Sequence, residues 1–146
     1  MFKAHTIGLV LFLGLFMGSN LWAAAGPEET KAALEQRVTK YWAARQSRDI
    51  KTVYEMESAS LPGGWLTLDR AMAVAGLPVR NVKIEELTVE GEQARVRVSG
   101  DVLVGTLGWM PQTLKDNWVL INGQWYHETR RPGSPASQDS KPSNSN

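Results

Sequence analysis

The chain has 146 residues, a formal net charge of +1 and no cysteine. This length is typical of one domain. Without cysteine there is no disulfide and no lipid attachment through a thiol, so a hydrophobic core alone must stabilise the fold. A nearly neutral chain without a basic cluster also argues against nucleic-acid binding, which depends on Lys and Arg at the phosphates.

The N-terminal residues have the pattern of a signal peptide. Lys3 precedes an apolar run at 7–17, and Ala23 and Ala25 are small residues at the spacing of a cleavage site. We expect cleavage after Ala25, which makes 1–25 a signal peptide and places the mature protein in the periplasm or outside the cell. An uncleaved anchor is the alternative, although the apolar run is shorter than the roughly 20 residues that a membrane span needs.

The C-terminal residues are rich in Ser, Pro and Asn and almost free of apolar side chains. Such a segment cannot bury enough surface to offset its conformational entropy. We therefore predict a disordered tail at 131–146 and a single domain at 26–130. Only the predicted signal segment, if it is kept, gives a reason for membrane contact.

Three helices are predicted in the first half of the domain. The first covers 27–47, where apolar residues recur every three or four positions. Asp49 is a suitable N-cap for a short second helix. Thr67 is a suitable cap for a third helix at 68–75, which Gly76 should end.

Strands are predicted in the second half. Apolar positions alternate within 82–89, but the alternation changes face, which a β-bulge at Glu85-Glu86 would explain. A long half-buried strand is predicted at 94–104, where alternation has no break. The segment GTLGWMPQ at 105–112 is expected to be irregular, because glycine and proline interrupt it.

A β-hairpin is predicted at the end of the domain, with strands at 112–121 and 124–129. Asn122-Gly123 favours a two-residue type I′ turn, which requires positive φ at both positions. This turn would pair Trp118 with His127 and place both on one face with Asp116 and Trp125. The opposite face carries Val119, Ile121 and Tyr126, whose apolar side chains would permit a homodimer through the sheet.

Helices followed by an antiparallel meander are typical of an α+β domain. The segments KYWAARQSRDIKTVYEM, at 40–56, and NWVLINGQWYHE, at 117–128, resemble the nuclear transport factor 2-like superfamily. That superfamily has a cystatin-like, cone-shaped fold in which N-terminal helices pack on a strongly bent antiparallel β-sheet. The resemblance covers roughly 30–129, and its fold hosts enzymes, binding modules and assembly subunits alike.

The sequence has three candidate catalytic residues, two of them implied by the resemblance. Tyr41 has the spacing to Asp49 that the oxyanion-donating tyrosine has in ketosteroid isomerases, and Asp116 is a loose counterpart of their second acid. His127 is added as a neighbour of Asp116, because a carboxylate raises the pKa of an adjacent imidazole and orients it for acid–base work. Those enzymes have a carboxylate base just before a proline-containing loop, where this chain has Leu61, so the isomerase reaction itself is not expected.

The candidate ligand- or partner-binding residues are aromatic or apolar. Trp65 follows a glycine-rich break, Trp109 and Met110 lie in the segment expected to be irregular, and Trp118 lies on the hairpin face. Large apolar groups in such segments often line a pocket or a partner surface. One histidine after signal removal and no cysteine leave little for a metal, and no cofactor motif is present.

Three functions remain open from the sequence. The first is an exported, non-catalytic module that binds a small apolar ligand in the cone or a protein of the cell envelope. The second is a small-molecule isomerase, dehydratase or cyclase that uses Tyr41 with Asp116 and His127. The third is a structural subunit of an envelope assembly.

Overall fold

The computed structural model describes residues 27–134. The predicted signal peptide at 1–25 lies outside the described residues, as does the predicted tail apart from 131–134, which form a turn. Within the described part, no helix has the length and apolar character needed to cross a membrane.

Three α-helices form the first half of the domain: α1 (Pro27–Ser47), α2 (Ile50–Glu55) and α3 (Leu68–Ala73). The predicted caps are confirmed, because Asp49 accepts the backbone N–H of Thr52 at the start of α2 and Thr67 accepts that of Arg70 at the start of α3. The third helix ends two residues before the predicted Ala75. The carbonyl of Ala75 instead accepts a hydrogen bond from Arg45 of α1 at 2.8 Å, which holds the chain outside the helix.

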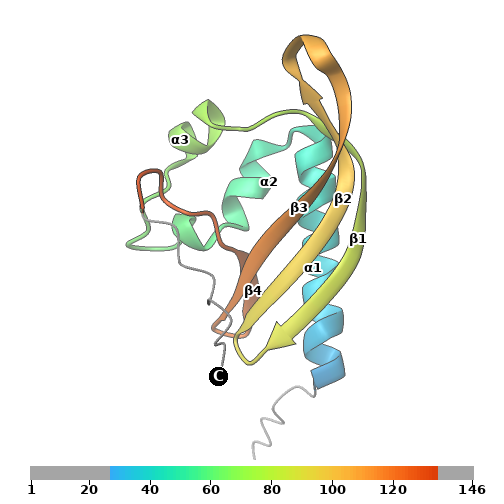
Figure 1. Cartoon of the computed structure of the whole chain (residues 1–146). Helices are drawn as coiled ribbons and strands as arrows, with labels where there is room; N and C mark the ends of the chain where they lie inside the picture. The colour runs from blue at the N-terminus through green and yellow to red at the C-terminus, as the bar shows by residue number, and fades with distance from the viewer. Residues whose placement is uncertain (1–26, 135–146) are drawn as a thin grey trace, which may run out of the picture.

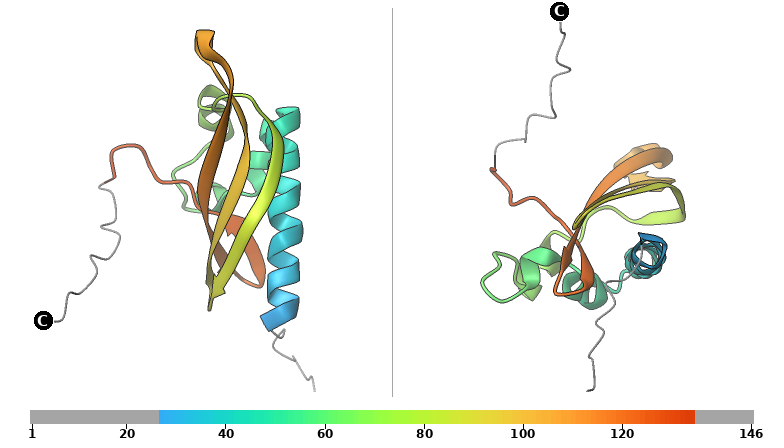
Figure 2. Two further views of the ribbon diagram at one scale, coloured as in Figure 1. Left: turned by 45° about the vertical axis from the view of Figure 1, so that its right-hand side comes forward. Right: turned by 90° about the horizontal axis from the view of Figure 1, so that it is seen from below.

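One antiparallel sheet forms the second half, in the order β1 (Val79–Glu90), β2 (Gln93–Val104), β3 (Gly108–Ile121) and β4 (Gln124–His127). The sheet curves around α1, and α2 and α3 cover the opening beside it (Figures 1 and 2). The predicted α+β cone is confirmed.

Two irregularities bend β1. The predicted bulge is confirmed, because the register against β2 shifts between Ile84 and Glu86. A second shift lies between Arg80 and Lys83, where Asn81 has a positive φ of 53°. Extra residues on one strand increase its bend and twist, which lets the sheet close around the helices.

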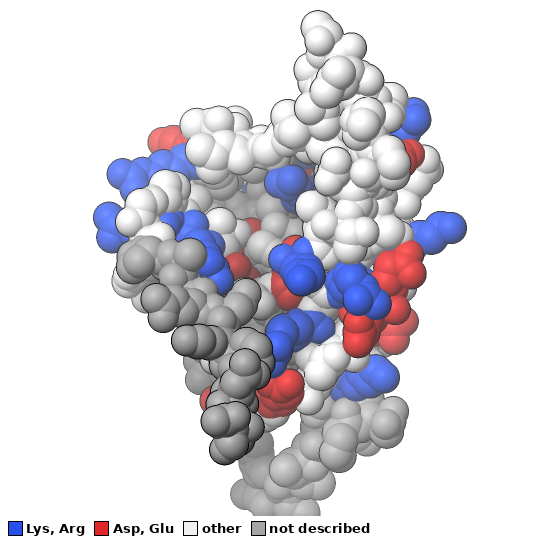
Figure 3. Space-filling view, in the orientation of Figure 1, with Lys and Arg blue, Asp and Glu red and all other residues white. Residues whose placement is uncertain are grey.

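The expectation of an irregular stretch at 105–112 was wrong for most of its length. After a 3₁₀ turn at Gly105–Leu107, β3 begins at Gly108 and pairs with the end of β2. The two strands form a ribbon that extends beyond β1 and carries no charged side chain at its tip (Figures 1 and 3). Pro111 is tolerated because β4 pairs only with the other end of β3, so the missing N–H lies on an unpaired edge.

The hairpin register is confirmed residue by residue. Asn122 and Gly123 have φ values of 49° and 78°, and Trp118 pairs with His127. The inner face of the sheet packs on α1 and α2 and forms the main core, whose fully buried side chains are Leu34, Val38, Met56, Val96, Val98, Trp118 and Trp125. On the outer hairpin face Val119, Ile121 and Tyr126 are half-buried, and the Tyr126 ring contacts the guanidinium of Arg37 at 5.6 Å.

Candidate functional site

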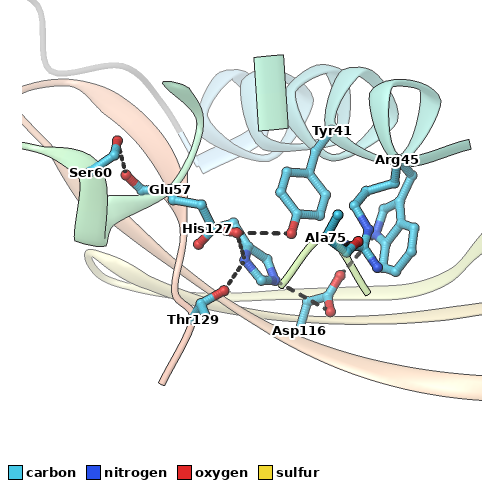
Figure 4. Close-up of polar contacts among 9 residues, drawn as sticks. Tyr41, Arg45, Glu57, Ser60, Ala75, Asp116, His127 and Thr129 are labelled. Atoms are coloured by element: carbon cyan, nitrogen blue, oxygen red, sulfur yellow. Dashed lines mark hydrogen bonds and ion pairs between the residues drawn. The ribbon is translucent and has the colours of Figure 1, made fainter. Parts of the chain in front are cut away.

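The structure brings Tyr41, Asp116 and His127 together on the inner side of the cone (Figure 4). The rings of Tyr41 and His127 are stacked, with centroids 4.4 Å apart. Nε2 of His127 lies 3.5 Å from Oδ1 of Asp116, although the two residues are only diagonal neighbours in the hairpin. The three side chains come from α1, β3 and β4.

A fourth residue, Glu57, lies at the centre of this group and was not singled out in the sequence. Its Oε1 accepts the hydroxyl of Tyr41 at 2.9 Å and lies 3.0 Å from Nδ1 of His127. Oγ1 of Thr129 lies 3.2 Å from the same ring nitrogen. Glu57 is only 4% exposed, and its contacts with Tyr41 and His127 offset part of the cost of burying its carboxyl group.

The backbone explains why Glu57 reaches His127. The segment after α2 runs beside the end of β4, where the N–H of His127 donates to the carbonyl of Met56 at 2.8 Å. Glu57 and His127 thereby form an isolated parallel bridge. Glu57 and His127 are 70 positions apart, so no local sequence pattern links them. The one feature that could have pointed to Glu57 is that it directly follows Met56, at the end of the apolar side of α2.

Two opposite effects act on His127. Burial by itself lowers the pKa of the imidazole, but hydrogen bonds and charge attraction from Asp116 and Glu57 raise it to about 9. The ring is therefore protonated at neutral pH, and each of its N–H groups faces a carboxylate. An imidazolium without a lone pair cannot accept a proton, so the geometry does not favour His127 as a general base.

The other two polar residues of this group, Tyr41 and Asp116, also make buried hydrogen bonds. Burial raises the pKa of the Tyr41 hydroxyl well above its usual value, and the charge of Glu57 adds to the effect, so Tyr41 remains a phenol. Asp116 is 8% exposed, and its Oδ2 accepts the indole N–H of Trp42 at 2.8 Å. Both oxygens of Asp116 are thus used within the core.

A pocket of about 140 Å³ lies beside this network, between α1, α2, α3 and the residues after β4. Figure 3 shows the surface hollowed between α3 and the sheet. The polar lining consists of Tyr41, Arg45, Tyr54, Glu57 and Thr129, and the larger apolar lining residues are Ile50, Val53, Trp65, Leu66 and Val74. One oxygen of Glu57, Oε2, is buried without a hydrogen-bond partner among the described residues.

The four predicted ligand- or partner-binding residues lie in different places. Trp65 lines the pocket. Trp109 and Met110 lie on the exposed ribbon, where the ring of Trp109 contacts the guanidinium of Arg80 at 4.2 Å. Trp118 is 1% exposed and packs edge-on against His127 and Tyr41, behind the pocket wall.

Leu61 stands just before Pro62, at the position where the resemblance to ketosteroid isomerases would require a carboxylate, and it does not line the pocket. Glu57, four positions earlier, supplies a carboxylate to the same group of side chains. Within 27–134, no three His, Cys, Asp or Glu side chains are arranged to hold a metal ion.

Comparisons with solved structures show the nuclear transport factor 2-like fold. An NTF2-like protein of unknown function from Pseudomonas putida matches with a TM-score of 0.52 and 11% identity, over 70% of this chain and 84% of that one. A SEC-C motif-containing protein from Rhodopseudomonas palustris matches with a TM-score of 0.54 and 14% identity, over 68% and 77% of the two chains. A SEC-C motif-containing protein from Psychrobacter arcticus matches with a TM-score of 0.54 and 14% identity, over 73% of this chain and 63% of that one.

At these identities the likeness concerns the fold alone. No protein-family model matches the sequence, and no curated protein matches it either.

Proposed function

We propose that the protein is an exported binding module that holds a small ligand in the pocket beside Glu57. The observation that carries this proposal is a pocket of about 140 Å³ with apolar and aromatic walls, next to a buried carboxylate oxygen that has no hydrogen-bond partner among the described residues. Ligand sites typically combine apolar walls with a few fixed polar groups. The signal-like pattern at 1–25 supports export.

The surroundings of Glu57 favour binding over a purely structural role. A buried acceptor that lacks a partner costs roughly 1–3 kcal/mol, and such groups are rare in folded proteins. The other oxygen of Glu57 is fixed by Tyr41 and His127, so the free oxygen has a defined position. A ligand whose binding brings a donor to this oxygen would remove that cost.

A pocket-filling variant tests the proposal. Ala71 is buried, lines the pocket and belongs to α3, whereas Ala73 of the same helix is exposed. We expect fragments with one ring to shift the NMR signal of the Trp65 indole in the unchanged protein and in Ala73→Leu, but not in Ala71→Leu. Thermal melting of both variants verifies that they are folded. A library in which no fragment shifts Trp65 would overturn the proposal.

A second candidate function is acid–base catalysis, because Tyr41 and Glu57 line the pocket and His127 contacts both of them. In this arrangement the carboxylate of Glu57 would accept a proton from the substrate, while the imidazolium beside Oε1 balances its charge. In this candidate mechanism the general base is Glu57 rather than His127.

Hydrogen–deuterium exchange distinguishes the two candidates. Cyclopentanone is small, uncharged and carries exchangeable protons next to its carbonyl. If Glu57 is a base, the protein should accelerate their exchange in D₂O at least tenfold over buffer, and Glu57→Gln should remove the acceleration. Binding of cyclopentanone without faster exchange would support the non-catalytic module.

A further inference from the structure

The exposed large apolar side chains of the domain come from two segments. One segment is α3 with the turn that follows it, and the other is the tip of the ribbon formed by β2 and β3. Within 27–134 these side chains are Leu68, Met72, Val74 and Leu77 in the first segment, and Leu107, Trp109 and Met110 in the second. The rest of the described surface exposes none. Apolar side chains gathered in this way mark an interaction site.

The two segments lie at the same end of the molecule. Nη1 of Arg45, in the last turn of α1, donates to the carbonyl of Ala75 at 2.8 Å. The N–H of Leu103 donates to the carbonyl of Pro78 at 3.0 Å, which joins the base of the ribbon to the chain after α3. Figures 1 and 2 show α3 and the ribbon near the C-terminus of α1. We call the segments 68–77 and 103–110 together the apolar end.

Charged residues lie at the boundary of the apolar end. None occurs at 71–79 or at 102–114. The charged residues that flank these two runs are Asp69, Arg70, Arg80, Asp101 and Lys115. They comprise three cations and two acids, so the boundary has a net charge of +1. It therefore does not repel the anionic head groups of a lipid surface, and the contact would rest on the apolar side chains.

The ribbon has the dimensions of an element that enters the surface of a bilayer. Leu107 at its tip is 72% exposed, more than any other large apolar side chain within 27–134. Trp109 follows two positions later, which is at most about 7 Å along the chain. The guanidinium of Arg80 lies 4.2 Å from the centre of the Trp109 ring. Interfacial elements enter roughly 5–10 Å of lipid, and tryptophan prefers the level of the head groups.

The shape of the apolar end favours lipid over a protein partner. One edge of β3 is free of β4 from Gly108 to Asp116, but Pro111 has no N–H, which disfavours the addition of a strand from another chain. The ribbon and α3 are separate elements with a hollow between α3 and the sheet (Figure 3). A stable protein interface needs about 800 Å² of matched surface on each partner, whereas fluid lipid adapts to two projections.

We propose that the apolar end docks on the surface of a lipid bilayer. Leu107 enters the apolar boundary, and Trp109 and Arg80 lie at the level of the head groups. Pro27 is at the other end of α1, about 30 Å away for a helix of 21 residues, so this contact is separate from any that the predicted signal segment makes. The inference goes beyond the proposed ligand pocket and does not depend on it.

Vesicle flotation tests the proposal on the chain from Gly26 onward, which contains the whole core and lacks the apolar run at 7–17. The vesicles consist of phosphatidylcholine alone or of a three-to-one mixture with phosphatidylglycerol. We expect the protein to float with both, with a modest preference for the anionic mixture. Leu107→Asp should weaken binding at least tenfold, because it withdraws a leucine from the lipid and puts a carboxylate in its place.

Thr88→Asp is the matched control. Thr88 is exposed on β1 near the far end of the sheet, so the substitution adds the same charge away from the apolar end. This variant should float like the unchanged protein. Leu107→Ser, which removes the leucine without adding a charge, should weaken binding less than Leu107→Asp. Thermal melting verifies that all three variants are folded.

The fluorescence of Trp109 reports the depth of the contact. Phosphatidylcholine with brominated acyl chains should quench the emission of the vesicle-bound protein. Trp109→Phe keeps an aromatic side chain and should keep most of the binding, but it should lose most of the quenching. Trp118 and Trp125 are buried in the core and should not be quenched.

The outcomes decide between lipid and other partners. An unchanged protein that does not float, or equal flotation of Leu107→Asp and Thr88→Asp, would overturn the proposal. Analytical ultracentrifugation tests a second copy of the chain as the partner. A dimer that Leu107→Asp dissociates, together with no binding to vesicles, would assign the apolar end to that dimer instead. None of these results bears on the ligand pocket.

Discussion

Both faces of the sheet carry charged side chains, but in opposite environments. On the outer face, Arg97 pairs with Glu86 and Arg95 with Glu90, each at 2.9 Å, and all four side chains are at least half exposed. Figure 3 shows such charges interleaved over β1 and β2. On the inner face, Asp116 and His127 are joined to Glu57 within the hydrophobic core.

The comparison shows that similar ion pairs have different consequences in water and in a core. Water screens the outer pairs, so each contributes little to stability and either partner can be removed. In the core, removing one partner leaves another charge buried and uncompensated. Three predictions test this difference.

The largest effect is expected for Asp116→Ala. The substitution leaves Nε2 of His127 and the indole N–H of Trp42 without their acceptor, and we expect the free energy of unfolding to fall by about 3–5 kcal/mol. Urea denaturation measures the change. Asp101→Ala, which removes an aspartate of the outer face bonded to Arg80, is the control and should cost about 1 kcal/mol or less. Equal losses in both variants would contradict the comparison.

The second effect is a dependence of stability on pH. The pKa of His127 is about 9 in the folded protein and about 6.5 in the unfolded chain, so the protonated ring stabilises the fold fully below pH 6.5. That contribution is lost as the pH rises through 9, and the free energy of unfolding should fall by about 3 kcal/mol over this interval.

Urea denaturation at a series of pH values measures this loss. His127→Gln should be less stable at pH 6 and should show a much flatter profile between pH 6.5 and 9. A profile that is unchanged by the substitution would mean that another group titrates.

The smallest effect is expected on the outer face. Glu86→Ala should change the free energy of unfolding by at most about 1 kcal/mol, and a double-mutant cycle with Arg97→Ala should give a coupling of about 0.2–1 kcal/mol. The coupling should decrease in 1 M salt, because the pair is exposed. A coupling above 2 kcal/mol that resists salt would show that water does not screen this pair.

The hairpin was predictable because its information is local. Asn122 and Gly123 both favour positive φ, and this turn sets the pairing of every residue up to His127. The same reasoning failed at 105–112, where glycine and proline suggested a break. There the pairing with β2 is also local, from Val104 with Gly108 to Gly100 with Gln112, but it follows a 3₁₀ turn at Gly105–Leu107 for which the sequence has no signal as specific as Asn-Gly.

The candidate site was predictable in part. The turn places Asp116 and His127 on one face, and the spacing of Tyr41 places it on the apolar side of α1. Glu57 could not be found in this way, because its position depends on the bridge between the end of α2 and β4. A glutamate after a short helix is ordinarily exposed, and its burial follows only from the packing of distant segments.

The sequence by itself determined the order of helices and strands, the helix caps and the register of the last hairpin, because each depends on residues within a few positions of one another. Only the tertiary structure decided that Glu57 lies between Tyr41 and His127, that the imidazole is held as a cation, and that one carboxylate oxygen remains free beside a pocket. These properties arise from groups brought together across 16 to 74 positions of chain, where burial and charge act through space.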